Sequence, residues 1–141
     1  MLTKYIQQKL SFCFYFLFIV FLHAQQTQMD VGLVSDFNKA VKLFNNKAYA
    51  AAQQSFIRVS KNQNSTFNLK ADADYYDAMC AIRLNQTDAD NKVLDFTENH
   101  PTSNKKDKAL LNVGNYYFDN KKAAYALKWY QRVNADGLNE D

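Results

Sequence analysis

The chain has 141 residues, with only three glycines and one proline. So few turn formers argue against an all-β fold, and the length suggests a single all-α domain. Aromatic residues make up 15% of the chain, which is ample material for a core, and the formal net charge is only +3.

Residues 1–24 have the layout of a secretory signal peptide. Lys4 and Lys9 form a positive segment, Leu10–Leu22 is nearly all apolar, and Ala24 is a small residue at the end. A membrane-spanning helix needs about 20 apolar residues, and this run is shorter. We therefore predict cleavage, export to the periplasm or cell envelope, and no membrane span after processing. A retained membrane anchor is the alternative.

Processing would change the charge and cysteine content. Removing Lys4 and Lys9 with no acid leaves 15 basic and 14 acidic residues, a net charge of +1. That balance gives no support for a nucleic-acid partner. Cys80 is then the only cysteine, so no intramolecular disulfide is expected. Residues 25–32 are polar and aperiodic, and we predict a flexible lead-in.

The clearest pattern in the chain predicts two helices joined by a tight turn at residues 110–133. Apolar residues recur at helical spacing on both sides of an Asp-Asn-Lys turn. They are Leu110, Val113, Tyr117, Phe118, Ala126, Leu127, Tyr130 and Val133. Gly114 lies inside the first helix, where glycine costs about 1 kcal/mol relative to alanine. We interpret it as a close helix–helix approach opposite Ala126.

These residues resemble the tetratricopeptide repeat (TPR), a helix–turn–helix unit of 34 residues. With Asp107 as repeat position 1, the family's pattern falls on Leu110, Val113, Gly114, Tyr117, Ala126, Tyr130 and Val133. The chain departs from the family at Leu110 and Leu138, where Trp and Pro are preferred. An unrelated helical hairpin is the alternative.

Two further copies of the pattern precede it. The first has an Asn-Asn-Lys turn at 45–47 and places Ala40, Leu43, Ala52, Phe56 and Val59 where the last copy has Gly114, Tyr117, Ala126, Tyr130 and Val133. The middle copy is degenerate: Asp77 or Cys80 takes the small position, depending on where the count starts. We predict a solenoid, an α-α superhelix of three TPR-like hairpins at 33–66, 67–102 and 103–141.

The resemblance implies a concave groove that binds an extended peptide or a helix. The groove positions that carry over are Val34, Phe37, Val41, Phe44 and Asn45 in the first copy, and Lys108, Leu111, Asn115, Phe118 and Asp119 in the third. Phe37 and Leu111 stand where a carboxylate clamp would need a basic residue. The groove is therefore expected to be apolar, with a rim of Lys and Asn.

No pattern in the chain predicts catalysis, a metal or a cofactor. His100 is the only histidine after processing, and with Cys80 it cannot supply three or four zinc ligands. Phosphate loops, dinucleotide fingerprints and nucleophile elbows do not occur. The sequence thus predicts a non-catalytic binding scaffold, similar to exported repeat proteins of Bacteroidetes-type bacteria. The alternatives are a sensor or docking domain of a larger envelope protein or enzyme, and a self-associating structural domain.

The C-terminal end of the predicted array is expected to be open. Solenoid repeats cover one another, and a terminal repeat needs a polar cap. The predicted last helix, Tyr125–Val133, is followed by eight residues, too few for a stable helix of its own. We therefore expect the array to continue beyond Asp141, or the open face to self-associate.

Overall fold

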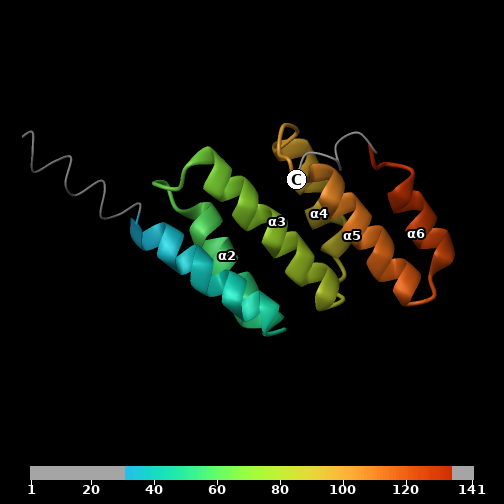
Figure 1. Ribbon diagram of the computed structural model, residues 1–141, viewed down its shortest axis with the longest axis horizontal. Helices are drawn as coiled ribbons and strands as arrows, with labels where there is room; N and C mark the ends of the chain where they lie inside the picture. Colours follow the sequence, from blue (N-terminus) through green and yellow to red (C-terminus); the bar gives the residue numbers. More distant parts are fainter. Residues whose placement is uncertain (1–30, 135–141) are drawn as a thin grey trace, which may run out of the picture.

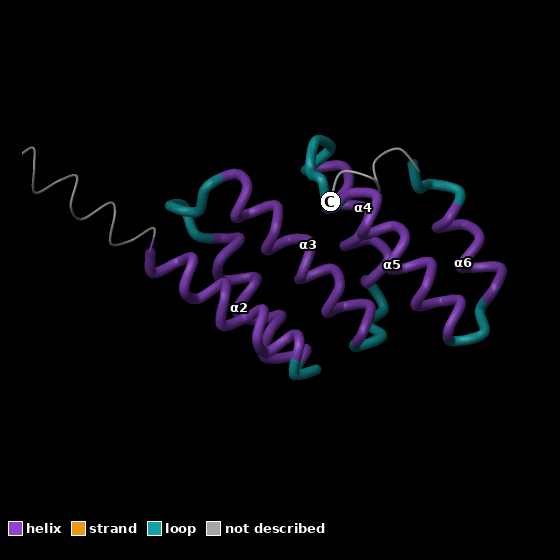
Figure 2. Tube along the Cα trace, in the orientation of Figure 1, coloured by secondary structure: helices purple, strands orange, loops and turns teal. Residues whose placement is uncertain are grey.

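The computed structural model describes residues 31–134, and helix is the one kind of regular secondary structure in this part of the chain. Its six helices form three successive antiparallel pairs that follow one another across the molecule (Figures 1 and 2). The helices are residues 31–45, α2 (Tyr49–Lys61), α3 (Phe67–Arg83), α4 (Ala89–Asn99), α5 (Lys106–Asp119) and α6 (Ala123–Tyr130). The prediction of an all-α fold built from helical hairpins is confirmed.

Most packing is between neighbours in the sequence, with α3 in the middle. Helix α3 packs on α2 before it, on its own partner α4 and on α5 after it. One core cluster joins the first hairpin to α3 around Phe56, Val59 and Cys80. The other joins the second and third hairpins around Phe96, Val113 and Trp129. The hairpins therefore form an open row and have no single shared centre.

The turns inside the three hairpins share one backbone geometry. Lys47, Asn85 and Lys121 have positive φ angles of 62°, 52° and 61°, which is uncommon for residues other than glycine. Each donates its backbone N–H to the carbonyl three residues earlier, and the next residue donates to the carbonyl five residues earlier. Both bonds satisfy carbonyls at the end of the first helix. These three residues therefore align the hairpins with one another.

This alignment fixes the register of the middle hairpin. Seven residues before the positive-φ residue stand Ala40, Ala78 and Gly114, which are small and buried. The small position is therefore Ala78, between the two expected candidates Asp77 and Cys80. A count from the first turn residue gives Cys80 because it takes Asn85 as the first residue of the turn, whereas Asn85 aligns with the last turn residues, Lys47 and Lys121. The connection to the second helix is also longer, since α4 begins four residues after Asn85, whereas α2 and α6 begin two residues after Lys47 and Lys121.

Gly114 does lie at a close approach, but the neighbour differs from the one expected. A Cβ atom built on Gly114 would lie 2.5 Å from Cδ1 of Tyr130 and closer still to Cε1. The Tyr130 hydroxyl then donates to Asn115 Oδ1 at 2.8 Å. Ala126 is buried in the same hairpin, yet it is the aromatic ring that requires a glycine here.

Two expected boundaries differ from the structure. Residues 31 and 32, assigned to the lead-in, are helical, and α6 ends at Tyr130 rather than Val133. The predicted signal peptide at 1–24, most of the lead-in, and residues 135–141 lie outside the described residues. The cleavage and continuation of the chain therefore stay predictions.

Candidate functional site

The predicted groove residues of the first hairpin are only partly open to solvent. Val34 is 48% exposed and Asn45 is also exposed, whereas Phe37, Val41 and Phe44 are half-buried. Phe37 and Phe44 lie edge-on to the ring of Tyr76 in α3, with centroids 5.8 and 5.2 Å away. Both rings thus already pack against the next hairpin.

The third hairpin exposes more of its predicted groove residues. Lys108, Asn115, Phe118 and Asp119 are exposed, and Leu111 is half-buried. The two predicted sets come from helices that lie on either side of α3 (Figure 1). A groove running through both would therefore have to cross α3.

The seam between α3 and α5 holds three polar contacts that sequence reasoning did not find. Lys105 Nζ lies 2.7 Å from Asp72 Oδ1, and Asn112 Nδ2 donates to the Tyr75 hydroxyl at 2.9 Å. At the far end, the guanidinium of Arg83 lies over the ring of Tyr116, 5.7 Å from its centroid. The contacts follow the same order along both helices, so α3 and α5 run parallel.

Residues of the middle hairpin therefore belong to this surface, although no groove position was assigned there. Burial is the largest cause that raises the pKa of Tyr75, partly offset by the Asn112 hydrogen bond. The phenol thus stays protonated at neutral pH.

The sequence does contain a signal for the register of the middle hairpin. Asn85 aligns with Lys47 and Lys121, and Asn tolerates the left-handed backbone conformation.

A polar cluster ties α2 to the middle hairpin. Gln53, a buried residue, exchanges two amide hydrogen bonds with Gln86 and donates a third to Asp77 at 2.7 Å. The other Asp77 oxygen lies 3.0 Å from Lys92 Nζ. In the outer hairpins an alanine stands four residues before the large aromatic residue of the second helix: Ala52 before Phe56, and Ala126 before Tyr130. In the middle hairpin this position, four residues before Phe96, is occupied by Lys92. The pairing of Lys92 with Asp77 explains how the middle hairpin accommodates a lysine at that position.

His100 has a structural environment at the end of α4. Its ring lies 5.5 Å from that of Phe67 and 5.6 Å from that of Phe96, and Nε2 lies 2.8 Å from Asp74 Oδ2. Ser60 donates to the other Asp74 oxygen. Buried His100 Nδ1 has no hydrogen-bond partner among the described residues. Asp74 thus connects His100, at the end of α4, to Ser60 near the end of α2.

Cys80 is an inert thiol. It is fully buried between α2 and α3. Burial, with a smaller contribution from the charge of Asp77, raises the pKa of the thiol to about 12. The nucleophilic thiolate is therefore essentially unpopulated at neutral pH.

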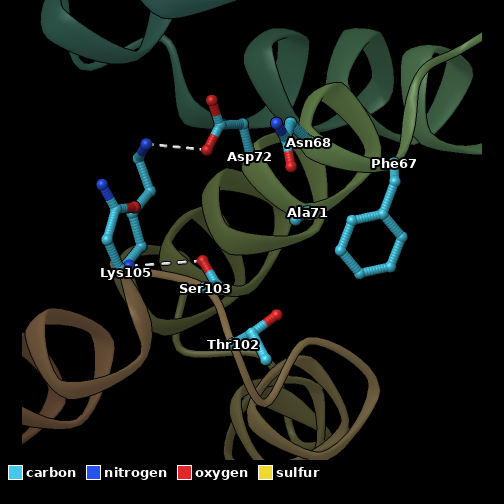
Figure 3. Close-up of a pocket in the computed structure, with 8 residues that line it drawn as sticks. Phe67, Asn68, Ala71, Asp72, Thr102, Ser103 and Lys105 are labelled. Carbon is cyan, nitrogen blue, oxygen red and sulfur yellow. Dashed lines mark hydrogen bonds and ion pairs between the residues drawn. The ribbon is translucent and has the colours of Figure 1, made fainter.

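A shallow cleft of about 320 Å³ lies between the start of α3 and the α4–α5 loop. In Figure 3 the Asp72–Lys105 pair closes one end and the ring of Phe67 stands at the other. Phe67 is 59% exposed. A second cleft of about 190 Å³ lies between α3 and α4 beside Lys92. Neither cleft brings together a nucleophile, a base and an orienting group.

Residues 31–134 also offer neither a metal site of protein ligands nor a membrane-spanning helix. This part of the chain holds no group of three or more His, Cys, Asp or Glu side chains placed to bind a metal ion. None of its helices is both long and apolar enough to cross a membrane. The class of protein that the fold defines is an all-helical domain of sequentially paired helices.

Comparison of the chain with protein-family models, with curated proteins and with solved structures gives no match.

Proposed function

We propose that this protein is a non-catalytic scaffold of the bacterial cell envelope. Its TPR-like hairpins would form a short solenoid that binds a protein ligand, either an extended peptide or a helix, on the surface made by the first helices of the hairpins. No cofactor or metal takes part in this proposal.

The observation that carries the proposal is the parallel seam between α3 and α5. Tyr75–Asn112 and Arg83–Tyr116 hold two first helices side by side. Because each first helix packs with one face on its own hairpin, the opposite faces form one continuous surface. Such a surface is the part of a repeat stack that is used for extended partners. The shared turn geometry of Lys47, Asn85 and Lys121 supports the repeat itself.

The cellular location is proposed from the sequence. The positive segment and the short apolar run before Ala24 support export, and export places the scaffold in the periplasm or cell envelope.

Selection from a displayed peptide library against residues 25–141 tests the binding proposal. Enriched peptides should lose at least tenfold in affinity when Lys108→Glu or Asn115→Arg changes the exposed face of α5. The matched control is Lys128→Glu on α6, which makes the same charge change on another helix and should leave affinity unchanged. Enriched peptides that respond only to Lys128→Glu, or a library that yields no specific binder, would contradict the proposed groove.

A further inference from the structure

The alignment of the hairpins defines a trailing face on each one, the face that points toward the next hairpin. Two residues mark this face in each hairpin. The first lies three residues before the positive-φ residue of the turn, which is Lys47, Asn85 or Lys121. The second lies three residues before the large aromatic residue of the second helix, which is Phe56, Phe96 or Tyr130. In chain order these pairs are Phe44 and Gln53, Ile82 and Val93, and Phe118 and Leu127.

In the first two hairpins the next hairpin covers this face. Phe44 packs on Tyr76, and Gln53 bonds to Gln86 and Asp77. Ile82 and Val93 are 3% and 0% exposed in the core cluster that contains Ala109, Leu110 and Val113 of α5. The trailing face is therefore an interface built twice within this molecule.

In the third hairpin the same face is open and apolar. Phe118 is 61% exposed and Leu127 is 56% exposed. A polar residue would suit these positions if they faced only water.

The opposite, leading face shows the reverse arrangement at the start of the row. In α3 this face is Ala73, Tyr76 and Cys80, which pack on the first hairpin. The aligned residues of helix 31–45 are Ser35, Asn38 and Lys42, all polar and exposed. Since the leading end is polar and the trailing end is apolar, two copies of this chain would not complement each other head to tail.

We propose that the trailing face of the third hairpin is a docking site for the first helix of a further hairpin, one whose contacting stripe carries small and aromatic residues at the spacing of Ala73, Tyr76 and Cys80. The site continues the internal interfaces on the same residues. It lies at one end of the row and shares Phe118 with the predicted groove positions, but it is argued from the covered faces of the first two hairpins and not from ligand binding in the groove.

An extended chain tests this inference. A second copy of residues 67–102, added after Asp141, supplies an α3-type leading face. The matched control adds residues 31–66, an equally long segment whose leading face is Ser35, Asn38 and Lys42. We expect the first extension to slow amide exchange in α6 at least tenfold and the control to leave it unchanged. Leu127→Asp should abolish the slowing.

A second measurement covers the case in which the added hairpin does not fold. A synthetic peptide of residues 67–83, titrated into the unextended chain, should shift the NMR signals of the Leu127 methyl groups, and a peptide of residues 31–45 should not. Equal effects of the two segments, or no effect of either 67–102 or the 67–83 peptide, would overturn the proposal. So would a dimer of the unextended chain that Leu127→Asp dissociates, because a second copy would then occupy the face.

Discussion

The close approach of Tyr130 to Gly114 allows a prediction whose sign depends on the neighbour. Gly114→Ala should gain about 1 kcal/mol from helix propensity. The new methyl group, however, would lie 2.5 Å from Cδ1 of Tyr130, where about 3.5–4.0 Å is the favourable separation. Overpacking of this kind costs about 1–3 kcal/mol. We therefore expect a net loss of about 1 kcal/mol, and a larger loss for Gly114→Leu.

Removing the ring should reverse the sign. In a Tyr130→Ala background the clash is gone and the propensity gain remains, so Gly114→Ala should stabilise the protein by about 1 kcal/mol. The coupling energy between the two positions is then about 2 kcal/mol, well above the error of additivity for independent sites. Urea unfolding followed by circular dichroism gives all four free energies of unfolding. If Gly114→Ala were stabilising in both backgrounds, the ring would not lie over Gly114 and the hairpin register would be wrong.

Three further predictions concern other parts of the chain. Cys80 should not react with a thiol reagent in the native state at neutral pH but should react in urea. Because the pKa of the thiol is raised from 9.0 to about 12 in the folded state, its stabilising contribution is complete below pH 9 and is lost as pH rises toward 12, by at most about 1.4 kcal/mol per pH unit. Cys80→Ala should reduce this alkaline loss of stability in denaturant titrations. Tyr117→Phe should lower the free energy of unfolding by about 1 kcal/mol, since the hydroxyl donates to Asp90 Oδ1 at 2.6 Å; an unchanged unfolding midpoint would refute a role for this bond between α5 and α4. Mass spectrometry of the native protein should find residues 1–24 missing, and a chain that starts at Met1 in the membrane fraction would contradict cleavage.

The outer hairpins could be predicted from the sequence because their local signals agree. Helical spacing of apolar residues, a turn ending in lysine and a small residue at the crossing all point to one structure. In the structure Lys47 and Lys121 adopt the same left-handed conformation. Two copies of one packing pattern are easier to recognise than a single copy.

The middle hairpin was harder to predict because its differences are compensated in three dimensions. Its turn is longer before α4, and Lys92 replaces a small residue. The partner that makes Lys92 acceptable, Asp77, lies 15 residues earlier, on the other helix of the hairpin. Similarly, no local pattern shows that Tyr130 rather than Ala126 approaches Gly114, because that depends on how α6 crosses α5.

The proposed groove was predictable only as a set of positions. Periodicity places Phe37 and Phe44 on one face of the first helix, but it does not show that Tyr76 of the next hairpin already contacts them. The seam contacts Tyr75–Asn112 and Arg83–Tyr116 join residues of different hairpins. Such contacts are set by the stacking of whole hairpins, which a single sequence does not encode locally.

The order of hairpins in an open row is the central claim, and native-state hydrogen exchange tests it most directly. Among the labelled helices that the structure describes, α3 packs on α2, α4 and α5, whereas α6 packs only on α5. Local opening should therefore be rarest in α3 and most frequent in α6. We predict that α3 amides exchange slowest in the monomeric chain and α6 amides fastest among the paired helices. Equal protection of α3 and α6 in a monomer would contradict the row.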